Sequence, residues 1–392
     1  MNVKLWAIVL ALIVVLSGTG MYLSSNAPND DKVVITARVN EEGSGIFANK
    51  SNLVERDVNG DLVWIDGKIS YDVNEWKGLV FMTPGLQTIQ HVMMKEIVEV
   101  DMGLKFVDYN PDRPDTENVN FINVGPGDML ATFLGEVAGK RADGGIIWES
   151  FFSNIMDSTN TAKLVFETGE RSPEHTCCVV VANRPFAESS TNSMARFLAA
   201  YIETVDWINN AMDVGGEDYA KLLSIAHNYL PAVSERVLDD AFHNVRYLYQ
   251  DSPEAGQRLS AVITDVADLV EGFKSLGGIL KDGRPESLGF ADSTAFAQWL
   301  VDERYLELSD LIIPGNIIDW ISLKVIVLNG DLHGIAAEVG KQLGIFEKYK
   351  INIELVTALN GADAMNLLVS GNAHIGLLGA PPTTIVSINM YA

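Results

Sequence analysis

Several short polar segments follow apolar runs that are rich in β-branched residues. In open α/β sheets, ligands bind beyond the carboxyl ends of the strands, where loops and helix N-termini present free N–H groups. Backbone donors in these segments could hold a carboxylate, a sulfonate or a carbonyl oxygen. The residues that we expect at such a binding site are Asn329, Asp331, His333, Asn360, Gly361, Asp363, Ala380, Pro381, Glu42, Ser44, Gln87, Thr88, Trp148 and Glu149.

Some of these residues also have an ordinary structural interpretation. His333 follows a predicted strand. Its side chain can face the expected ligand-binding cleft, or it can point away from it and have no role in binding. Trp148 can stack on a planar ligand or pack in the cleft wall. Asp363 and Asp128 can contact the ligand or cap helices. Glu42 would favour a cationic or hydrogen-bonding group if it borders the cleft, and is otherwise a solvated charge. Because these segments contain no Lys or Arg, they favour a neutral or zwitterionic ligand.

Catalytic chemistry is not indicated. The six histidines show no metal-ligand spacing, no G-x-S-x-G motif is present, and Gly125-Pro126-Gly127 does not form a P-loop motif. The only cysteines, Cys177 and Cys178, are adjacent in an apolar run, which predicts two buried strand residues and supports neither a disulfide framework nor a spaced metal site. We therefore expect no enzyme, no cofactor and no metal.

Length and charge narrow the class of protein. A chain of 392 residues with 47% hydrophobic residues predicts two domains. The formal net charge of -24 argues against nucleic acid or an anionic membrane surface as the main partner. Residues 1–31 combine Lys4, an apolar run and a polar tether, which is typical of a signal peptide or membrane anchor. The rest of the chain is therefore expected outside the cytoplasm, exported and possibly tethered.

The elements that would position these residues follow an α/β pattern at both ends of the chain. Residues 49–75 carry turn pairs and predict an inserted hairpin or two, residues 192–278 are helical, and residues 311–322 are a linker. Expected strands are Val33–Val39, Leu79–Met82, Val119–Val124, Gly145–Trp148, Leu164–Glu167, Cys177–Ala182, Lys324–Leu328, Ile351–Thr357 and His374–Leu378. The last three strands are too few for a stable sheet, so an earlier segment must complete it.

A resemblance to a known family rests on these segments. Lys324–Ala380, with Gly344-Ile345-Phe346 and Leu368-Val369-Ser370-Gly371, resembles the beginning of the nitrate/sulfonate/taurine-type ABC-transporter substrate-binding proteins, a family that includes pyrimidine-precursor binders. Val33–Phe47 resembles what normally follows that segment, and Trp76–Thr88 resembles the start of the second lobe. The resemblance implies an α/β, two-lobed type II periplasmic-binding-protein fold, which here would be circularly permuted. A truncated tandem duplication is the alternative.

The resemblance also implies a domain plan and a set of partners. Lobe one would comprise 32–48 and about 200–392, with its usual first half encoded at 323–392 and closing helices at 200–310; lobe two would be 76–190. The protein would be a monomer that delivers a small ligand, either a sulfonate such as taurine, nitrate or a pyrimidine-like compound, to an ABC permease. The alternatives are an enzyme of pyrimidine or thiamine-precursor synthesis and a ligand-sensing domain.

Overall fold

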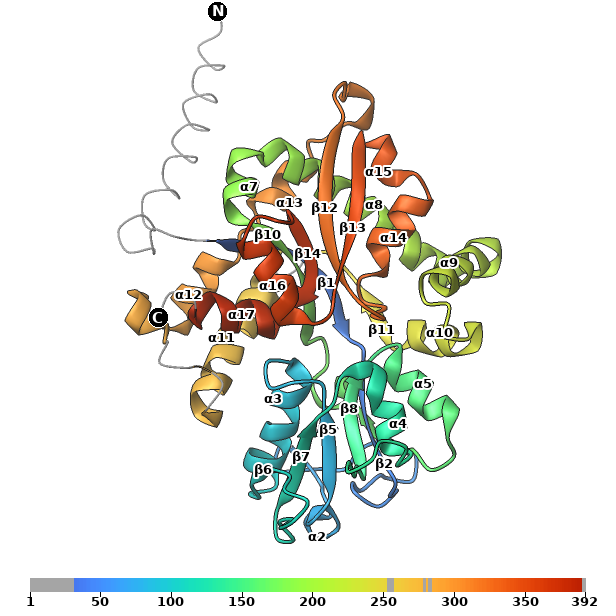
Figure 1. The fold of residues 1–392 in the computed structure, drawn as a ribbon. Helices are drawn as coiled ribbons and strands as arrows, with labels where there is room; N and C mark the ends of the chain where they lie inside the picture. The colour runs from blue at the N-terminus through green and yellow to red at the C-terminus, as the bar shows by residue number, and fades with distance from the viewer. Residues whose placement is uncertain (1–31, 252–256, 278–279, 281–283, 390–392) are drawn as a thin grey trace, which may run out of the picture.

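The computed structural model describes residues 32–251, 257–277, 280 and 284–389. Two mixed six-stranded sheets, each flanked by helices, form two units that lie one above the other in Figure 1. The expectation of an α/β fold is confirmed. The predicted leader lies outside the described residues, and no described helix is long and apolar enough to cross a membrane.

The first sheet, sheet A, joins segments from the two ends of the chain. Its strand order is β11-β1-β10-β14-β12-β13. β12 is parallel to β13 and β14, whereas β10 is antiparallel to both β14 and β1. The strands are β1 (Val33–Glu42), β10 (Thr176–Asn183), β11 (Val245–Tyr247), β12 (Ile321–Leu328), β13 (Ile351–Ala358) and β14 (Ile375–Gly379). The N-terminal strand therefore completes a sheet begun by the last 70 residues.

The second sheet, sheet B, repeats this pattern. Its strand order is β6-β7-β5-β8-β2-β9, with β5 parallel to β7 and β8, and β2 antiparallel to β8 and β9. Both sheets therefore share one pattern. A set of parallel strands is followed by an antiparallel strand, β10 in sheet A and β2 in sheet B, and the next strand, β1 or β9, is antiparallel to that one. The strands are β2 (Ser44–Ala48), β5 (Val80–Thr83), β6 (Phe106–Asp108), β7 (Val119–Asn123), β8 (Gly144–Trp148) and β9 (Lys163–Glu167).

The described chain passes between the sheets at two places. β1 leads through Gly43 directly into β2, and β9 leads through residues 168–175 back into β10. The two crossings lie side by side, because the N–H of Glu42 donates to the carbonyl of His175 at 3.2 Å. Gly43 has a φ of +80°, a conformation that favours glycine. Two adjacent strand connections of this kind can act as a hinge.

A buried arginine holds β1 in place beside the crossings. Arg38 is 2% exposed and its Nη1 lies 2.8 Å from Asp251 Oδ1 and 2.9 Å from Glu41 Oε1. Its other terminal nitrogen donates to the carbonyl of Glu174 at 3.0 Å, on the second crossing. A buried cation is tolerated only with such partners, so this group fixes the two crossings relative to sheet A.

Helices cover the sheets, and the long helix α8 shows why the sequence folds this way. Its apolar stripe of Met194, Phe197, Leu198, Tyr201 and Val205 is fully buried, as the helical spacing predicts. The α-helices of the described residues are α2 (Val73–Trp76), α3 (Ile89–Glu96), α4 (Met129–Phe133), α5 (Phe151–Ser158), α6 (Thr168–Arg171), α7 (Arg184–Ser189), α8 (Thr191–Val214), α9 (Gly216–Tyr229), α10 (Glu235–His243), α11 (Ser260–Leu276), α12 (Ser293–Leu300), α13 (Arg304–Ser309), α14 (Ile335–Gln342), α15 (Ile345–Lys348), α16 (Gly361–Val369) and α17 (Ala380–Asn389).

Some local expectations need correction. From Asp128, Gly139 and the pattern between them, the sequence predicts a helix that Asp128 caps and that runs to about Ala138. The observed helix α4 ends at Phe133, because Gly135 with φ +74° ends it a turn before Gly139. The side chain of Asp128 does not cap it. In the inserted region the turn at Asp66-Gly67 does join a hairpin, β3 (Trp64–Ile65) with β4 (Lys68–Ile69).

The expected ranges of the two lobes differ from the sheets at two places. Residues 32–48 do not stay in one unit, since β2 joins sheet B. Residues 76–190 do not either, since β10 joins sheet A. Both differences have the same cause. The strand that follows each crossing joins the sheet that the chain has just entered.

Candidate functional site

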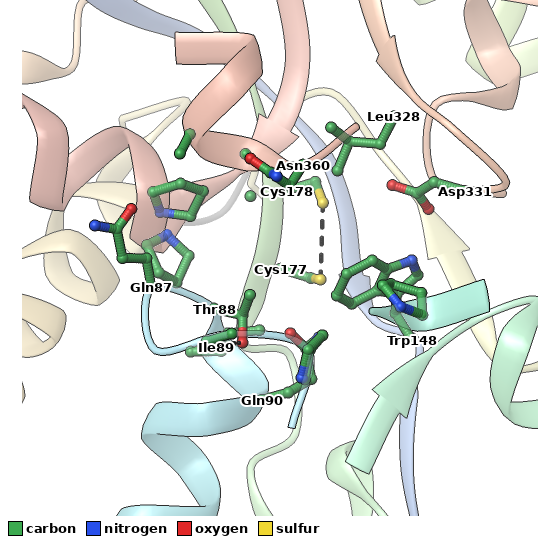
Figure 2. Close-up of a pocket in the computed structure, with 18 of the residues that line it drawn as sticks. Gln87, Thr88, Ile89, Gln90, Trp148, Cys177, Cys178, Leu328, Asp331 and Asn360 are labelled. Atoms are coloured by element: carbon green, nitrogen blue, oxygen red, sulfur yellow. Dashed lines mark hydrogen bonds between the residues drawn. The ribbon is translucent and has the colours of Figure 1, made fainter. Parts of the chain in front are cut away.

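A cavity of about 410 Å³ lies where the two units meet (Figure 2). It is found at the carboxyl ends of parallel strands from both sheets, as the sequence predicts. Leu328 ends β12 and Gly379 ends β14 on one side, and Trp148 ends β8 on the other. The lining residues are Pro84, Gly85, Leu86, Gln87, Thr88, Ile89, Gln90, Pro126, Trp148, Cys177, Cys178, Leu328, Asp331, His333, Leu359, Asn360, Gly361, Ala362, Gly379, Pro381 and Pro382.

Two helix N-termini, one from each unit, point their N–H groups toward this cavity. Thr88 caps α3 by accepting from the N–H of His91 at 3.3 Å. Asn360 caps α16 in the same way, by accepting from the N–H of Asp363 at 3.0 Å. The first N–H groups of a helix have no acceptor within it, so those of Ile89 and Gly361 remain for a ligand oxygen.

A buried acid and base lie at the end of β12. His333 and Asp331 are each 2% exposed, and Nδ1 of His333 lies 3.2 Å from Oδ1 of Asp331. Burial raises the pKa of Asp331, although the nearby His333 opposes this. Burial alone would lower the pKa of His333, but the charges of Asp331, Cys177 and Glu149 raise it above its usual value. Perturbed buried pairs of this kind often mark functional sites.

Two thiols lie next to this pair. The Sγ atoms of Cys177 and Cys178 are 3.8 Å apart, and Sγ of Cys178 lies 3.8 Å from Nδ1 of His333. Both cysteines are free and buried. A hydrogen bond between the thiols lowers the pKa of Cys177 to about 7, against the effect of burial. Figure 2 shows both sulfurs on the cavity wall, across from Gln87 and close to Trp148.

A buried carboxylate ties the two units together beside the cavity. Glu149 accepts hydrogen bonds from the hydroxyl of Ser153 at 2.9 Å and from Nδ2 of Asn244 at 2.8 Å. Ser153 follows β8 of sheet B, whereas Asn244 directly precedes β11 of sheet A. Burial raises the pKa of Glu149, although these hydrogen bonds oppose the shift. Glu149 therefore connects the units and does not line the cavity.

Other contacts between the units lie on either side of the cavity. On one side, Val92 of α3 packs with Phe273, Leu276 and Ile385. On the other, Arg236 of α10 forms an ion pair with Asp157 of α5. The two units are therefore in contact on both sides of the cavity.

The structure brings many of the predicted site residues to the cavity. Those that line it are Gln87, Thr88, Trp148, Asp331, His333, Asn360, Gly361 and Pro381. The cavity lining does not include Asn329, Asp363, Ala380, Glu42, Ser44 or Glu149.

The residues outside the lining have structural contacts of their own. The carboxylate of Glu42 accepts from the N–H of Glu174 at 2.9 Å, because Asn40–Glu42 continue β1 and are not a loop. Ser44 accepts from the amide of Gln90 at 2.9 Å. Asp363 accepts from the N–H of Leu359 at 3.1 Å, which supports its interpretation as a helix-start residue. Ala380 is fully buried in α17.

Sequence reasoning missed Cys177 and Cys178 as cavity residues. They are buried strand residues, as predicted, yet both line the cavity. Their neighbour His333 is 155 positions away from Cys178 in the sequence, so no spacing rule could join them. Gln90 and Ala362 were also missed, although each lies two residues after a helix cap, Thr88 or Asn360, that was among the expected site residues.

The chain is similar in fold to several solved structures of other proteins. No protein-family model matches the chain, and no curated protein matches it. It is similar to the periplasmic nitrate-binding protein NrtA from Synechocystis, at 13% identity and TM-score 0.46 over 76% of this chain and 71% of that one. It is also similar to a zinc-bound ligand-binding component of an ABC-type import system from Staphylococcus aureus, at 15% identity and TM-score 0.36 over 64% and 70%.

A third similar structure is the periplasmic aliphatic sulphonate-binding protein SsuA from Escherichia coli. The identity is 15% and the TM-score 0.36, over 57% of this chain and 59% of that one. Because these identities and scores are low, the geometry of this chain itself must carry any assignment of function.

Proposed function

We propose that this chain is a solute-binding protein whose two lobes close on a small ligand and deliver it to an ABC permease outside the cytoplasm. The single observation that carries the proposal is the cavity of about 410 Å³ between two units that are joined by two adjacent strand crossings. Such a connection permits the units to rotate about the hinge, and closure would then enclose the ligand. A cavity of this size suits a small organic molecule.

The polar groups of the cavity favour a ligand with both acceptor and donor atoms. The N-termini of α3 and α16 would bind a carboxylate, sulfonate or carbonyl oxygen. The indole Nε1 of Trp148 has no hydrogen-bond partner among the described residues and could donate to the same ligand. Asp331 would meet a positively charged or hydrogen-bonding group. A zwitterion such as an amino acid or a taurine-like sulfonate therefore fits better than a simple anion.

The domain plan that goes with this function is a circular permutation. Supporting it, β1 and β14 lie in one sheet, separated only by β10, although they come from opposite ends of the chain. We infer that lobe one is built around sheet A and lobe two around sheet B. A truncated duplication would instead leave sheet A to be completed by another copy.

The proposed function predicts that a small ligand stabilises the protein. We expect taurine, methanesulfonate, nitrate, glycine or thymine, added in turn, to include a compound that raises the melting temperature. At a hundredfold excess over Kd, binding adds about 2.7 kcal/mol to the free energy of unfolding, which is a shift of several degrees. Thermal melting of the purified protein measures this.

Matched variants show where the compound binds. Gln87→Ala removes an exposed amide of the cavity, and Ala362→Phe fills part of the cavity beside α16. Both should reduce the shift by half or more, while the control Gln298→Ala, an exposed residue of α12 outside the cavity, should leave it unchanged. The proposal fails if none of the five compounds alters melting, or if the cavity variants respond like the control.

A further inference from the structure

The strand that carries the two cysteines is irregular where they occur. In a regular strand, neighbouring side chains point to opposite faces of the sheet. Along the β1–β10 ladder, however, Asn40 pairs with Cys178 and Glu41 with Thr176, so Cys177 has no partner. This is a β-bulge, which can turn an extra side chain toward a site. As a result both thiols line the same cavity.

His333 completes a cluster of three donor atoms. Sγ of Cys177, Sγ of Cys178 and a ring nitrogen of His333 all lie within 4.8 Å of one another. All three residues are at least 95% buried. The cluster combines distant segments. The cysteines lie on β10 and His333 follows β12, and β14 lies between these two strands in sheet A.

The distances suit a tetrahedral metal ion. Zinc–sulfur bonds of about 2.3 Å and zinc–nitrogen bonds of about 2.1 Å at tetrahedral angles place two sulfurs about 3.8 Å apart and a sulfur and a nitrogen about 3.6 Å apart. The two sulfurs here are 3.8 Å apart, and Sγ of Cys178 is 3.8 Å from Nδ1 of His333. An ion could therefore bind with movements of the side chains alone.

The surrounding contacts leave these groups free to bind an ion. Within the described part of the chain, the two thiols contact each other, and Sγ of Cys178 also contacts His333. Nε2 of His333 is buried, and it has no hydrogen-bond partner among the described residues. With Nδ1 as the ligand atom, the ring proton stays on Nε2. The carboxylate of Asp331 accepts from the backbone N–H of His333 at 2.9 Å, which positions this residue beside the thiols.

We propose that Cys177, Cys178 and His333 bind one thiophilic transition-metal ion, with Zn²⁺ as the representative ion, on the wall of the cavity. Three protein donors leave one tetrahedral position open toward the cavity, as in zinc sites that accept an exogenous ligand. If the fourth ligand is the transported solute, an oxygen or nitrogen atom of the solute binds the ion. That part of the inference rests on the proposed function. The three-residue site itself stands without it.

Cobalt provides the most direct test. The full-length protein, reduced with a phosphine and kept under nitrogen, is titrated with Co²⁺ and then with Zn²⁺. We expect one Co²⁺ per chain, an intense sulfur-to-cobalt charge-transfer absorption, visible bands of tetrahedral cobalt, and loss of both when Zn²⁺ is added. Absence of the charge-transfer absorption, or its persistence in Cys177→Ser and Cys178→Ser, overturns the proposal.

Variants separate metal binding from folding. Cys177→Ser, Cys178→Ser and His333→Gln should each weaken Zn²⁺ binding at least a hundredfold in competition with a chelating dye. His243→Gln, which changes a histidine with a 68% exposed side chain, should bind Zn²⁺ like the wild type. Circular dichroism reports whether each variant folds. If a variant does not fold, the wild-type protein is treated with iodoacetamide with and without Zn²⁺. Zn²⁺ should then slow alkylation of Cys177 and Cys178, and equal alkylation counts against the site.

The two proposals can fail separately. If a compound raises the melting temperature but no Co²⁺ binds to the thiols, the metal site is wrong and the proposed function stands. If Co²⁺ binds with the expected spectrum but no compound stabilises either the metal-free or the Zn²⁺-loaded protein, the metal site stands and the proposed function is wrong.

Discussion

At the residue scale, burial decides what the histidines of this chain can do. His91 is 3% exposed and packs between Phe106 and Phe121, with Nδ1 3.1 Å from the hydroxyl of Thr83. Burial lowers the pKa of His91 to about 4, and the charge of Lys95 adds to this effect. His333 is equally buried, but it has the Asp331 carboxylate beside it and its pKa is raised. One histidine therefore supports the core, and the other belongs to the site.

The lowered pKa of His91 predicts a loss of stability in mild acid. The unfolded chain binds a proton near pH 6.5 and the folded protein near pH 4, so this contribution is complete above pH 6.5 and is lost as the pH falls toward 4. The loss is at most about 3 kcal/mol. Urea unfolding of the wild type and of His91→Gln at several pH values measures it, and the difference between the two proteins should shrink as the pH falls through this window. A difference that is independent of pH contradicts the assignment.

Residue types and their positions after strands were enough to place part of the site. Gln87, Thr88, Asn360 and Gly361 follow strands, and helix-start chemistry identifies them from the sequence alone. The sequence could not show that Trp148 lines the cavity and Glu149 does not. The reason is that Glu149 is bound by Asn244, which belongs to the other unit. The thiol cluster depends on a β-bulge and on a contact between distant segments. Neither feature can be predicted from a short stretch of sequence.

At the scale of elements, the crossing between β1 and β2 is the feature on which any lobe motion depends. Gly43 has a positive φ, and a methyl group added there would lie 2.7 Å from Nε2 of His333 and 3.0 Å from Cγ2 of Val245. The crossing, the start of β11 and His333 are therefore packed against one another. The sequence predicts that Glu42 and Ser44 lie in a polar segment after a strand. It could not show that two strands continue through it.

This packing predicts the effect of Gly43→Ala. Both the strained φ and the close contacts should destabilise the folded state, by about 2–4 kcal/mol together. Gly67→Ala is a matched control, since Gly67 has the same φ of +80° but nothing within 4 Å of an added methyl group. It should cost about 1 kcal/mol from the backbone alone. Equal losses in urea unfolding would show that the crossing tolerates a side chain and that the contact with His333 is unimportant.

Most elements of the fold follow from patterns in the sequence. Alternating β-rich and helical segments predicted the parallel strands, and helical spacing predicted the buried face of α8. The short strands β6 and β11 were not predicted, because three residues carry too little pattern. β2 was assigned to the wrong unit, because its pairing with β8 and β9 is set by tertiary contacts.

At the scale of the whole molecule, the two units touch on both sides of the cavity and are covalently joined only at the crossings of the described chain. The contacts at Val92 and at the Asp157–Arg236 ion pair are small, so a modest binding free energy would change the balance between open and closed arrangements. Under the proposed function, a ligand that touches both α3 and α16 would bind the closed arrangement better than the open one. If the proposed function holds, the present structure corresponds to that closed arrangement.

Small-angle X-ray scattering tests this central claim most directly. The protein is measured alone and with whichever of taurine, methanesulfonate, nitrate, glycine or thymine raises its melting temperature most. Closure of the two lobes predicts a larger radius of gyration for the protein alone, and, with the compound, a curve that matches the one calculated from the present structure. Gln87→Ala should need more compound to reach that curve. Identical scattering with and without a compound that stabilises the protein would contradict closure of two lobes around the cavity.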